Sequence, residues 1–347
     1  MILRKKSWGG AGLSGIVFTG VVLLALYFVS VMPLSAISLP LLGSSELCRK
    51  YNGLPVNWRS DTRAGMVHIN GGNFTLGTTL GYEEERQEIK SQVKDFWVDQ
   101  TEVTVAQFAD FVNETGYKTE AEREGGAVVF RKPVAKEQNQ FSYKWWVYVK
   151  GADWRHPSGI QSSSINNLPV TLITLADAQA YAKWLGHDLP TEAEWEYAAK
   201  AGHEQSASLE SEPRDAKGKP VANFWQGEFP SRNSAEDGYE GLAPVGCYPA
   251  NDFKLYDMLG NAWEQTKDRY SESHQLEPVN GVKESPVKAN QTMVIKGGSH
   301  LCGRDFCVRY RPSAREAHEA NLPISHIGFR TVIRGNAEDA LPAFNPW

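Results

Sequence analysis

Two cysteines, Cys302 and Cys307, stand five positions apart in the segment Cys302-Gly-Arg-Asp-Phe-Cys307. Five residues of extended chain would span about 16 Å, so a turn must bring the two sulfurs together, and Gly303 makes such a turn easier. Three kinds of chemistry then compete. The pair is an inert disulfide of an exported protein, a thiol redox pair, or a site where two soft thiolates hold Cu(I) and leave room for a third sulfur.

Two other segments are rich in oxygen ligands. Residues 223–239 and 257–264 mix carboxylates and amides with glycine turns that free backbone carbonyls. This is the ligand set that calcium prefers, although neither segment has the spacing of an EF-hand. On composition alone, a solvated acidic loop is the more common explanation of such a segment.

The N-terminus carries the pattern of an export signal. Three cations at positions 4–6 precede an apolar run from about residue 15 to residue 42. A run of about 20 apolar residues spans a bilayer, and no small-x-small cleavage site ends this one. We therefore predict an uncleaved signal-anchor over residues 1–45, with a cleaved signal peptide and a buried core helix as the alternatives. The body would then be extracytoplasmic and membrane-anchored, at the periplasmic face of an inner membrane or in the lumen of the secretory pathway.

Composition limits what the body can do. The chain has 347 residues, of which 41% are hydrophobic, so a large core can form. Lys and Arg number 36 against 41 Asp and Glu, so the basic surface that nucleic-acid binding requires is absent. We predict a linker at 46–62, one monomeric domain at 63–335 and a tail at 336–347. Phosphate loops, dinucleotide motifs and fixed repeats are not found in the sequence.

Few stretches of the body keep a regular period. Helices are predicted at 104–113, at 176–185 and after the capping box formed by Thr191 and Glu194. Four runs have the composition of strands: Met66–Ile69, Phe96–Val98, Met293–Ile295 and Ile327–Ile333. Long loops separate these elements, and bound metal often holds such loops in place.

Several motifs along residues 66–333 resemble the formylglycine-generating enzymes, the oxidases that activate sulfatases. The motifs are Gly71-Gly-Asn-Phe-Thr-Leu-Gly77, Thr101-Glu-Val-Thr104, Leu189-Pro-Thr-Glu-Ala-Glu-Trp-Glu-Tyr197, Trp225-Gln-Gly-Glu-Phe-Pro230, Gly260-Asn-Ala-Trp-Glu264, Gly297-Gly-Ser-His-Leu-Cys302 and Gly328-Phe-Arg330. Some of them occur in members of the superfamily that lack this activity. The discriminating feature is the cysteine pair.

This resemblance implies a fold and two structural calcium ions. The fold would be an α+β, C-type-lectin-like domain with little regular secondary structure. The first calcium ion would take the side chains of Asn223 and Asp237 and the carbonyls of Phe224 and Tyr239. The second would take the side chains of Asp257 and Glu264 and the carbonyls of Gly260 and Ala262.

The resemblance also implies a reaction. Cys302 and Cys307 would hold Cu(I), and O2 would be the co-substrate that converts a peptidyl cysteine to formylglycine. The substrate would be an unfolded sulfatase segment of the form Cys-x-Pro-x-Arg. Ser299, Trp263 and Asn261 match family positions that line this pocket. The alternative function is a non-catalytic, lectin-like binding or maturation module of the same superfamily.

The sequence departs from the family pattern at a few positions. Phe306 stands where the family usually has Tyr, Gln265 replaces a Trp, and His326 stands where many relatives carry an amide or His. Asp257 stands where Asn is more frequent. The remaining cysteines, Cys48 and Cys247, have no family role, and they either pair with each other or remain free.

Overall fold

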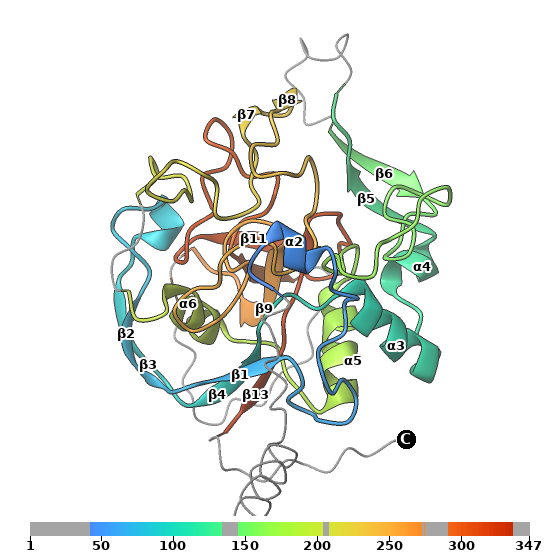
Figure 1. Cartoon of the computed structure of the whole chain (residues 1–347), viewed down its shortest axis with the longest axis horizontal. Coiled ribbons are helices and arrows are strands. Elements are labelled where there is room, and N and C mark those ends of the chain that lie inside the picture. Colours follow the sequence, from blue (N-terminus) through green and yellow to red (C-terminus); the bar gives the residue numbers. More distant parts are fainter. Residues whose placement is uncertain (1–41, 134–144, 204–207, 273, 275–290, 336–347) are drawn as a thin grey trace, which may run out of the picture. The chain divides into compact units, whose positions relative to one another are not determined.

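Small sheets joined by long loops make up the fold (Figure 1). The computed structural model describes residues 42–133, 145–203, 208–272, 274 and 291–335. The described residues form one compact unit. The structure thus confirms a mixed α+β domain with little regular secondary structure.

Two of the sheets have more than two strands. The first has the order β1-β4-β13, and all of its pairings are antiparallel. The second has the order β11-β10-β9-β12, in which only β12 and β9 run parallel. The strands are β1 (Met66–Ile69), β4 (Phe96–Asp99), β9 (Trp263–Arg269), β10 (Thr292–Lys296), β11 (Arg315–Glu319), β12 (Ile327–Gly328) and β13 (Val332–Arg334).

Antiparallel strand pairs and short helices complete the described part of the chain. The pairs are β2 (Gly72–Leu76) with β3 (Ile89–Val93), β5 (Gly126–Phe130) with β6 (Trp146–Lys150), and β7 (Gly227–Glu228) with β8 (Arg232–Asn233). The short helices are α2 (Ser45–Cys48), η1 (Glu83–Glu85) and α4 (Glu120–Glu124).

The three predicted helices are confirmed as α3 (Val105–Thr115), α5 (Leu175–Leu185) and α6 (Glu192–Lys200). Each begins after a threonine whose side chain forms a capping box with the third helical residue. Such a box satisfies backbone N–H groups that have no partner within the helix. The helix starts are therefore set by local sequence.

One predicted strand is wrong in extent. Residues 327–333 do not form a single strand, because β12 pairs with β9 in one sheet and β13 pairs with β4 in another. Between them Arg330 is fully buried, and its guanidinium donates to Glu264 of β9 and to the carbonyl of Asp99 in β4. The chain crosses between the sheets at this arginine.

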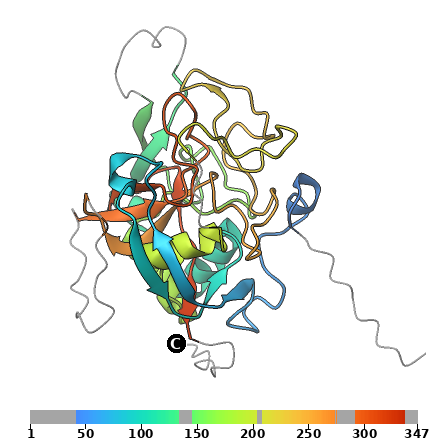
Figure 2. The ribbon, with the colours of Figure 1, turned by 90° about the vertical axis from the view of Figure 1, so that its left-hand side faces the viewer.

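The stretch 46–62, which we expected to be a linker, packs against the body. Cys48 is fully buried and forms a disulfide with Cys247, with a Cα–Cα distance of 5.0 Å. Trp58 packs on the α3–α5 core and donates its indole N–H to Asp110 at 2.8 Å. Figure 2 shows α2, in blue, beside the yellow and orange loops to which this disulfide joins it.

Residues 1–41 of the predicted membrane anchor lie outside the described residues, which begin at Leu42, whereas Ser44 and Ser45 at its end cap and begin α2. Among the residues that are described, none of the helices has the length and apolar character needed to cross a membrane.

Candidate catalytic cysteine pair and oxygen-ligand clusters

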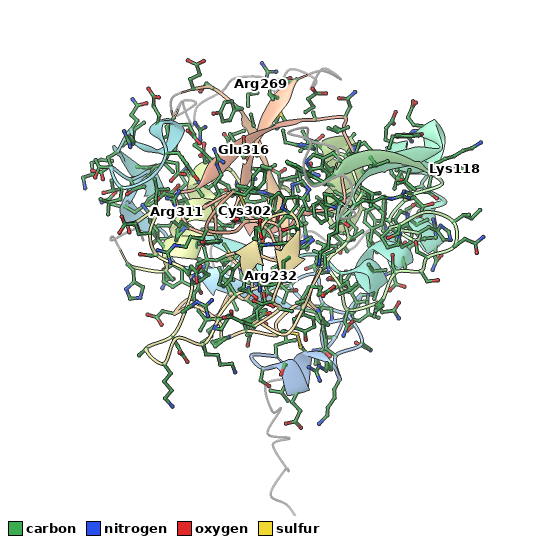
Figure 3. The ribbon with its side chains drawn as sticks, turned by 90° about the horizontal axis from the view of Figure 1, so that it is seen from above. Lys118, Arg232, Arg269, Cys302, Arg311 and Glu316 are labelled. Carbon is green, nitrogen blue, oxygen red and sulfur yellow. A yellow bond between two sulfur atoms is a disulfide. The ribbon has the colours of Figure 1, made fainter. Side chains whose placement is uncertain are left out.

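The turn that the sequence requires between Cys302 and Cys307 is present. The backbone N–H of Cys307 donates to the carbonyl of Gly303 at 3.0 Å, and the two Cα atoms lie 4.5 Å apart. The structure joins the two sulfurs as a disulfide. The loop is fixed from outside by Trp225, whose backbone N–H donates to the carbonyl of Cys302 at 2.8 Å. Figure 3 shows Cys302 close to Arg232 of the β7–β8 hairpin, in keeping with the bridge between Trp225 and Gly303.

The surroundings of the pair are apolar and almost dry. Cys302 is 1% exposed and Cys307 is 9% exposed. Both pack in one cluster with Trp263, the first residue of β9. Ser299 is buried, and its carbonyl accepts the backbone N–H of Cys302 at 2.9 Å. The structure therefore places the predicted residues Ser299 and Trp263 next to the cysteine pair.

Aromatic rings adjoin the outer side of the cysteine loop. The ring of Phe306 stacks on Phe229, with centroids 4.1 Å apart and planes 10° apart, and Phe306 is 45% exposed. The side chain of Asp305 accepts the backbone N–H of Phe229 at 3.0 Å. The residue that replaces the family tyrosine therefore lies at the surface, stacked on the β7–β8 hairpin.

The first predicted calcium site is assembled around Asp237. Its carboxylate accepts the backbone N–H groups of Phe224 and Tyr239, each at 3.0 Å, so these residues surround one carboxylate. Asn223 precedes Phe224, and its Nδ2 donates to the carbonyl of Gly241 at 2.9 Å. The Oδ1 atom of Asn223 is buried and has no hydrogen-bond partner among the described residues. An acceptor oxygen left in this way is available to a cation.

The second predicted site contains a carboxylate that the sequence analysis missed. Asp257 and Glu264, two of the predicted ligands, are both buried, and Glu102, from the Thr101-Glu-Val-Thr104 motif, is buried with them. Glu264 accepts two hydrogen bonds from Arg330, at 2.6 and 2.7 Å. Oε2 of Glu102 and Oδ1 of Asp257 accept from no other donor among the described residues, and a hydrogen bond between the Glu102 and Asp257 side chains joins the two carboxyl groups. The sequence does show that Glu102 is an acidic residue within a family motif. Its position in the sequence, however, does not indicate that it lies beside Asp257 and Glu264 in the fold.

Because Glu102, Asp257 and Glu264 are buried close together, ionising all three carboxyl groups costs free energy through desolvation and mutual repulsion. Burial, together with the neighbouring Asp257 and Glu264, raises the pKa of Glu102 well above its ordinary value. Burial likewise raises the pKa of Asp257 to about 6. The cluster holds three carboxylates and the guanidinium of Arg330, so its acidic groups outnumber its basic one. Buried charges require compensation, and a divalent cation would supply it.

Asn261 joins the two oxygen clusters to each other. Its Oδ1 accepts from Nδ2 of Asn223 at 2.9 Å, and its Nδ2 donates to Glu102 at 3.0 Å. Its backbone N–H donates to the carbonyl of Asn223 at 2.8 Å. The side chain of Asn261, a position expected to line the cysteine pocket, is thus bonded within the oxygen clusters.

Side chains alone do not make a metal site in the described part of the chain. No three His, Cys, Asp or Glu side chains there form a group suited to an ion. A cation at either cluster would also need backbone carbonyls and amide oxygens. Gly260 and Ala262, the expected carbonyl ligands of the second site, flank Asn261 in this region, and Gly260 has a φ of 77°. Such a left-handed turn is typical of glycine.

The remaining departures from the family pattern are accommodated within the core. Gln265 is buried and donates from Nε2 to the carbonyl of Ile173 at 3.2 Å. The ring of His326 packs against Trp146, with centroids 4.7 Å apart. Burial lowers the pKa of the neighbouring His300 to about 4, so that imidazole is neutral at pH 7. None of these side chains removes a predicted ligand.

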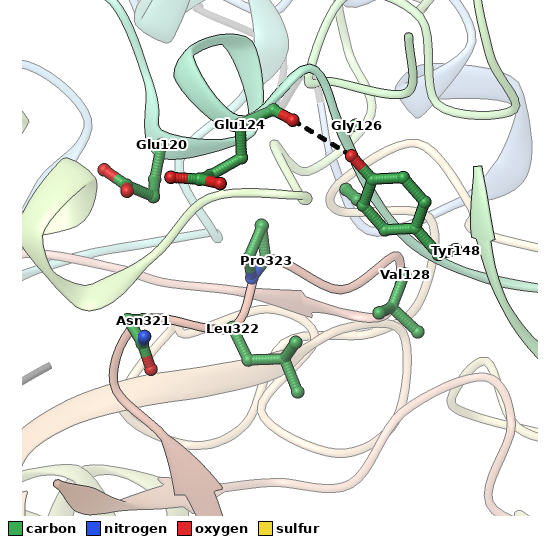
Figure 4. A pocket seen from close by; sticks show the side chains of 9 residues that line it. Glu120, Glu124, Gly126, Val128, Tyr148, Asn321, Leu322 and Pro323 are labelled. Carbon is green, nitrogen blue, oxygen red and sulfur yellow. Dashed lines mark hydrogen bonds between the residues drawn. The ribbon is translucent and has the colours of Figure 1, made fainter. Parts of the chain in front are cut away.

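A surface hollow of about 520 Å³ lies where α4 meets the β5–β6 hairpin (Figure 4). Tyr148 borders it and donates its hydroxyl to the carbonyl of Glu124 at 3.0 Å. Val128, the cross-strand neighbour of Tyr148, also lines the hollow and packs against the apolar cluster that contains the cysteine pair. The hollow thus borders that cluster.

The site is a buried pair of cysteines in an α+β domain with little regular secondary structure. Comparison with known proteins identifies the family to which such a domain belongs. The sulfatase-modifying factor enzyme 1-like domain matches residues 53–335. The chain is 40% identical to a formylglycine-generating enzyme of Mycobacterium tuberculosis over 290 residues, which covers 77% of this chain and 97% of the relative. It is 38% identical to that of Mus musculus over 317 residues, covering 86% and 83%. The chain belongs to the sulfatase-modifying factor family.

Other similarities show that membership of this family does not by itself establish catalytic activity. The chain is also 38% identical over 280 residues to an inactive Cα-formylglycine-generating enzyme 2 of Bos taurus, covering 76% of this chain and 86% of the relative. Among solved structures, PvdO from Pseudomonas aeruginosa matches with a TM-score of 0.54 and 22% identity, covering 78% of this chain and 94% of that chain. That likeness concerns the fold alone. Activity must therefore be argued from the site.

Proposed function

We propose that this protein converts the cysteine of a sulfatase Cys-x-Pro-x-Arg segment to formylglycine, with Cu(I) as its cofactor and O2 as its oxidant. The observation that carries the proposal is the pair Cys302 and Cys307, held by a turn and buried beside Trp263. The names of the relatives at 36–40% identity support the substrate and the product. The proposal of copper rests on the two soft thiolates together with the resemblance to the family, and the proposal of O2 rests on that resemblance.

The donor set fits Cu(I) once the disulfide is reduced. Two soft thiolates are the ligands that Cu(I) prefers, and the turn already holds Cys302 and Cys307 close together. The apolar surroundings keep water from the two sulfurs. Bound Cu(I) would supply the activation of O2. The chain itself would hold the metal and leave a place for the substrate sulfur beside Cys307, the more exposed of the two cysteines.

Electron balance requires a further reactant. Conversion of the substrate thiol and its methylene carbon, with water, to an aldehyde and hydrogen sulfide releases two electrons, whereas reduction of O2 to water takes four. The other two electrons must come from an external thiol, which becomes a disulfide. The overall products are the aldehyde, hydrogen sulfide, one water and that disulfide. The same class of reductant would open the Cys302–Cys307 disulfide.

We propose calcium at both oxygen clusters. The unpartnered Oδ1 of Asn223 supports this at the first cluster, and at the second a cation would offset the excess of buried carboxylates more fully than the contact between Glu102 and Asp257 does. Calcium bound only by the folded state stabilises it by mass action. We expect Glu102→Gln to weaken calcium binding at the second cluster, measured by titration calorimetry, with exposed Glu210→Gln as the control. Equal affinity in the two variants would exclude Glu102 as a ligand.

A peptide assay tests the proposed activity. The purified full-length protein is incubated with Cu(I), O2, a thiol reductant and a Cys-x-Pro-x-Arg peptide. Mass spectrometry should show loss of the thiol mass and gain of an aldehyde, and the variants Cys302→Ser and Cys307→Ser should be inactive. Near-normal turnover by either variant would contradict a two-thiolate site. A copper-loaded wild type that leaves the peptide unchanged would favour a non-catalytic module, the second candidate suggested by the inactive relatives.

We also propose that the protein works outside the cytoplasm, anchored by residues 1–45. The disulfide between Cys48 and Cys247 supports an oxidising compartment, because such bonds are rare in the cytosol. Protease protection of the body in sealed membrane vesicles tests this location. Digestion from the cytoplasmic side would contradict it.

A further inference from the structure

The loop formed by residues 237–247 runs from the first oxygen cluster to the disulfide between Cys48 and Cys247. Both half-cystines are buried. Cys48 is held from its other side by the buried Asn167, whose Nδ2 donates to the carbonyl of Cys48 at 2.9 Å. The carbonyl of Asn167 accepts the backbone N–H of Val245, also at 2.9 Å. The disulfide therefore fixes the end of the loop to a segment that is itself bonded to the body.

Tyr239 reaches from the first oxygen cluster to the disulfide. Its backbone N–H donates to Asp237 at 3.0 Å, and its carbonyl is a predicted calcium ligand. Its hydroxyl lies 3.2 Å from Sγ of Cys247 and 3.9 Å from Sγ of Cys48. A disulfide sulfur carries no hydrogen, so the hydroxyl is the donor in both contacts. A change at the disulfide is thus a change in the packing of a residue that belongs to the cluster.

The same loop also contacts the second oxygen cluster. The backbone N–H of Gly246, next to Cys247, donates to Oδ2 of Asp257. The backbone N–H of Ala243 donates at 2.9 Å to Oδ1 of Asn261, the residue that joins the two clusters. Both contacts are made by backbone atoms, so their geometry follows the path of the chain near Cys247.

We propose that the Cys48–Cys247 disulfide positions the ligands of the oxygen clusters, so that opening it weakens calcium binding. The inference rests on the proposed binding of calcium at these clusters. Ligands that are already in place need little further ordering when the ion binds, whereas a loop freed at one end loses conformational entropy on binding. We expect calcium affinity to fall about tenfold, within the range usual for coupled sites. The coupling is reciprocal, so calcium also favours the disulfide over two thiols.

This coupling bears on the external thiol that the proposed reaction consumes. Reduction of the disulfide by a dithiol breaks one S–S bond and forms another in the reductant, and the two electrons and two protons go to Cys48 and Cys247. Burial of both sulfurs and bound calcium oppose this step. The oxygen clusters therefore stay intact in a medium that opens the Cys302–Cys307 disulfide.

Calcium titration calorimetry on the full-length protein tests the inference. Cys48→Ala opens the disulfide from the side of the segment 46–62 and leaves every predicted calcium ligand in place. Trp58→Phe is the matched control, because it removes the hydrogen bond to Asp110 from the same segment and keeps the disulfide. We expect calcium affinity to be about tenfold below wild type in Cys48→Ala and within threefold of wild type in Trp58→Phe. Melting curves establish that each variant is folded at the temperature of the titration.

Reduction of wild type gives a second measurement that needs no variant. The protein is equilibrated in a dithiol redox buffer with either calcium or magnesium at the same concentration. Free thiols are then alkylated, and the peptides that contain Cys48 and Cys247 are quantified by mass spectrometry. Magnesium is the control, because it demands a stricter octahedral geometry at shorter distances than calcium. Calcium should shift the equilibrium toward the disulfide about tenfold relative to magnesium.

The outcomes separate this inference from the proposed calcium sites. Affinities of Cys48→Ala within threefold of wild type at both calcium-binding steps would overturn the inference and leave the calcium sites standing. The same conclusion would follow from an equal loss in Trp58→Phe, or from a thiol–disulfide equilibrium that is the same in calcium and magnesium. A wild type that binds no calcium would overturn both proposals. None of these measurements depends on turnover of the peptide, so the proposed reaction is tested independently.

Discussion

The disulfide between Cys48 and Cys247 allows the change in melting temperature on its removal to be predicted. It links residues 199 positions apart, and both half-cystines are buried, so its loss frees a very long loop in the unfolded chain. The chain-entropy relation gives about 18 cal/mol/K for a loop of this length, or about 5 kcal/mol at 25 °C. A domain of this size changes its melting temperature by about 1.6 °C per kcal/mol. We therefore expect Cys48→Ser to lower the melting temperature by about 8 °C.

The assay is a double-mutant cycle followed by scanning calorimetry. If the two sulfurs are bonded, either single substitution already removes the bond, so Cys48→Ser, Cys247→Ser and the double variant should unfold at similar temperatures. A pair of independent buried thiols would instead give additive losses. The Cys302–Cys307 disulfide supplies the matched control, because its loop of five residues is worth only about 2 kcal/mol by the same relation.

Additive losses, or a decrease of less than about 2 °C in either single variant, would refute this reasoning. Either result would mean that Cys48 is not bonded to Cys247 in the folded protein. The segment 46–62 would then have to be held by its other contacts, such as the bond from Trp58 to Asp110. Proteolysis of this segment in wild type and in the double variant distinguishes the two arrangements.

The remaining predictions concern the metals, Phe306 and pH. Cys302→Ser and Cys307→Ser should each abolish tight Cu(I) binding, measured by competition with a chromogenic chelator, while melting temperatures fall by only about 3 °C. Removal of calcium by chelation should lower the melting temperature by several degrees, and an unchanged transition after proven calcium loss would count against both oxygen clusters. Phe306→Tyr should raise kcat by up to about fivefold, the worth of one hydrogen bond, without loss of stability, since the exposed ring leaves its hydroxyl hydrated. Equal kcat in steady-state assays would show that the family tyrosine is dispensable here. Burial raises the pKa of Asp268 to about 6 in the folded protein. The free energy of folding that this group contributes through its protonation is therefore fully present below about pH 4 and is lost as pH rises through 6. Asp268→Asn, which can still accept the backbone N–H of Glu192, should therefore be about 3 kcal/mol more stable than wild type at pH 7.5 and no more stable at pH 4, as judged by urea unfolding.

Local sequence determined the helices and the turn of the cysteine pair. Thr104, Thr174 and Thr191 cap α3, α5 and α6 through contacts that reach only three residues along the chain. Cys302 and Cys307 are close enough in sequence that a single turn must bring them together. The motifs also identified the family, because they preserve short runs of residues in order.

Tertiary structure decided which distant residues meet. Glu102 joins Asp257 and Glu264 only because β4, β9 and the segment around Arg330 converge, and its environment rather than its motif raises its pKa. The stacking of Phe306 on Phe229 likewise joins two loops that have no sequence relation. Buried charges and exposed rings gain their properties from the groups around them, and those groups come from separate parts of the chain. Periodicity and spacing describe neighbours along the chain, so they could predict the helices and the cysteine turn but not these contacts.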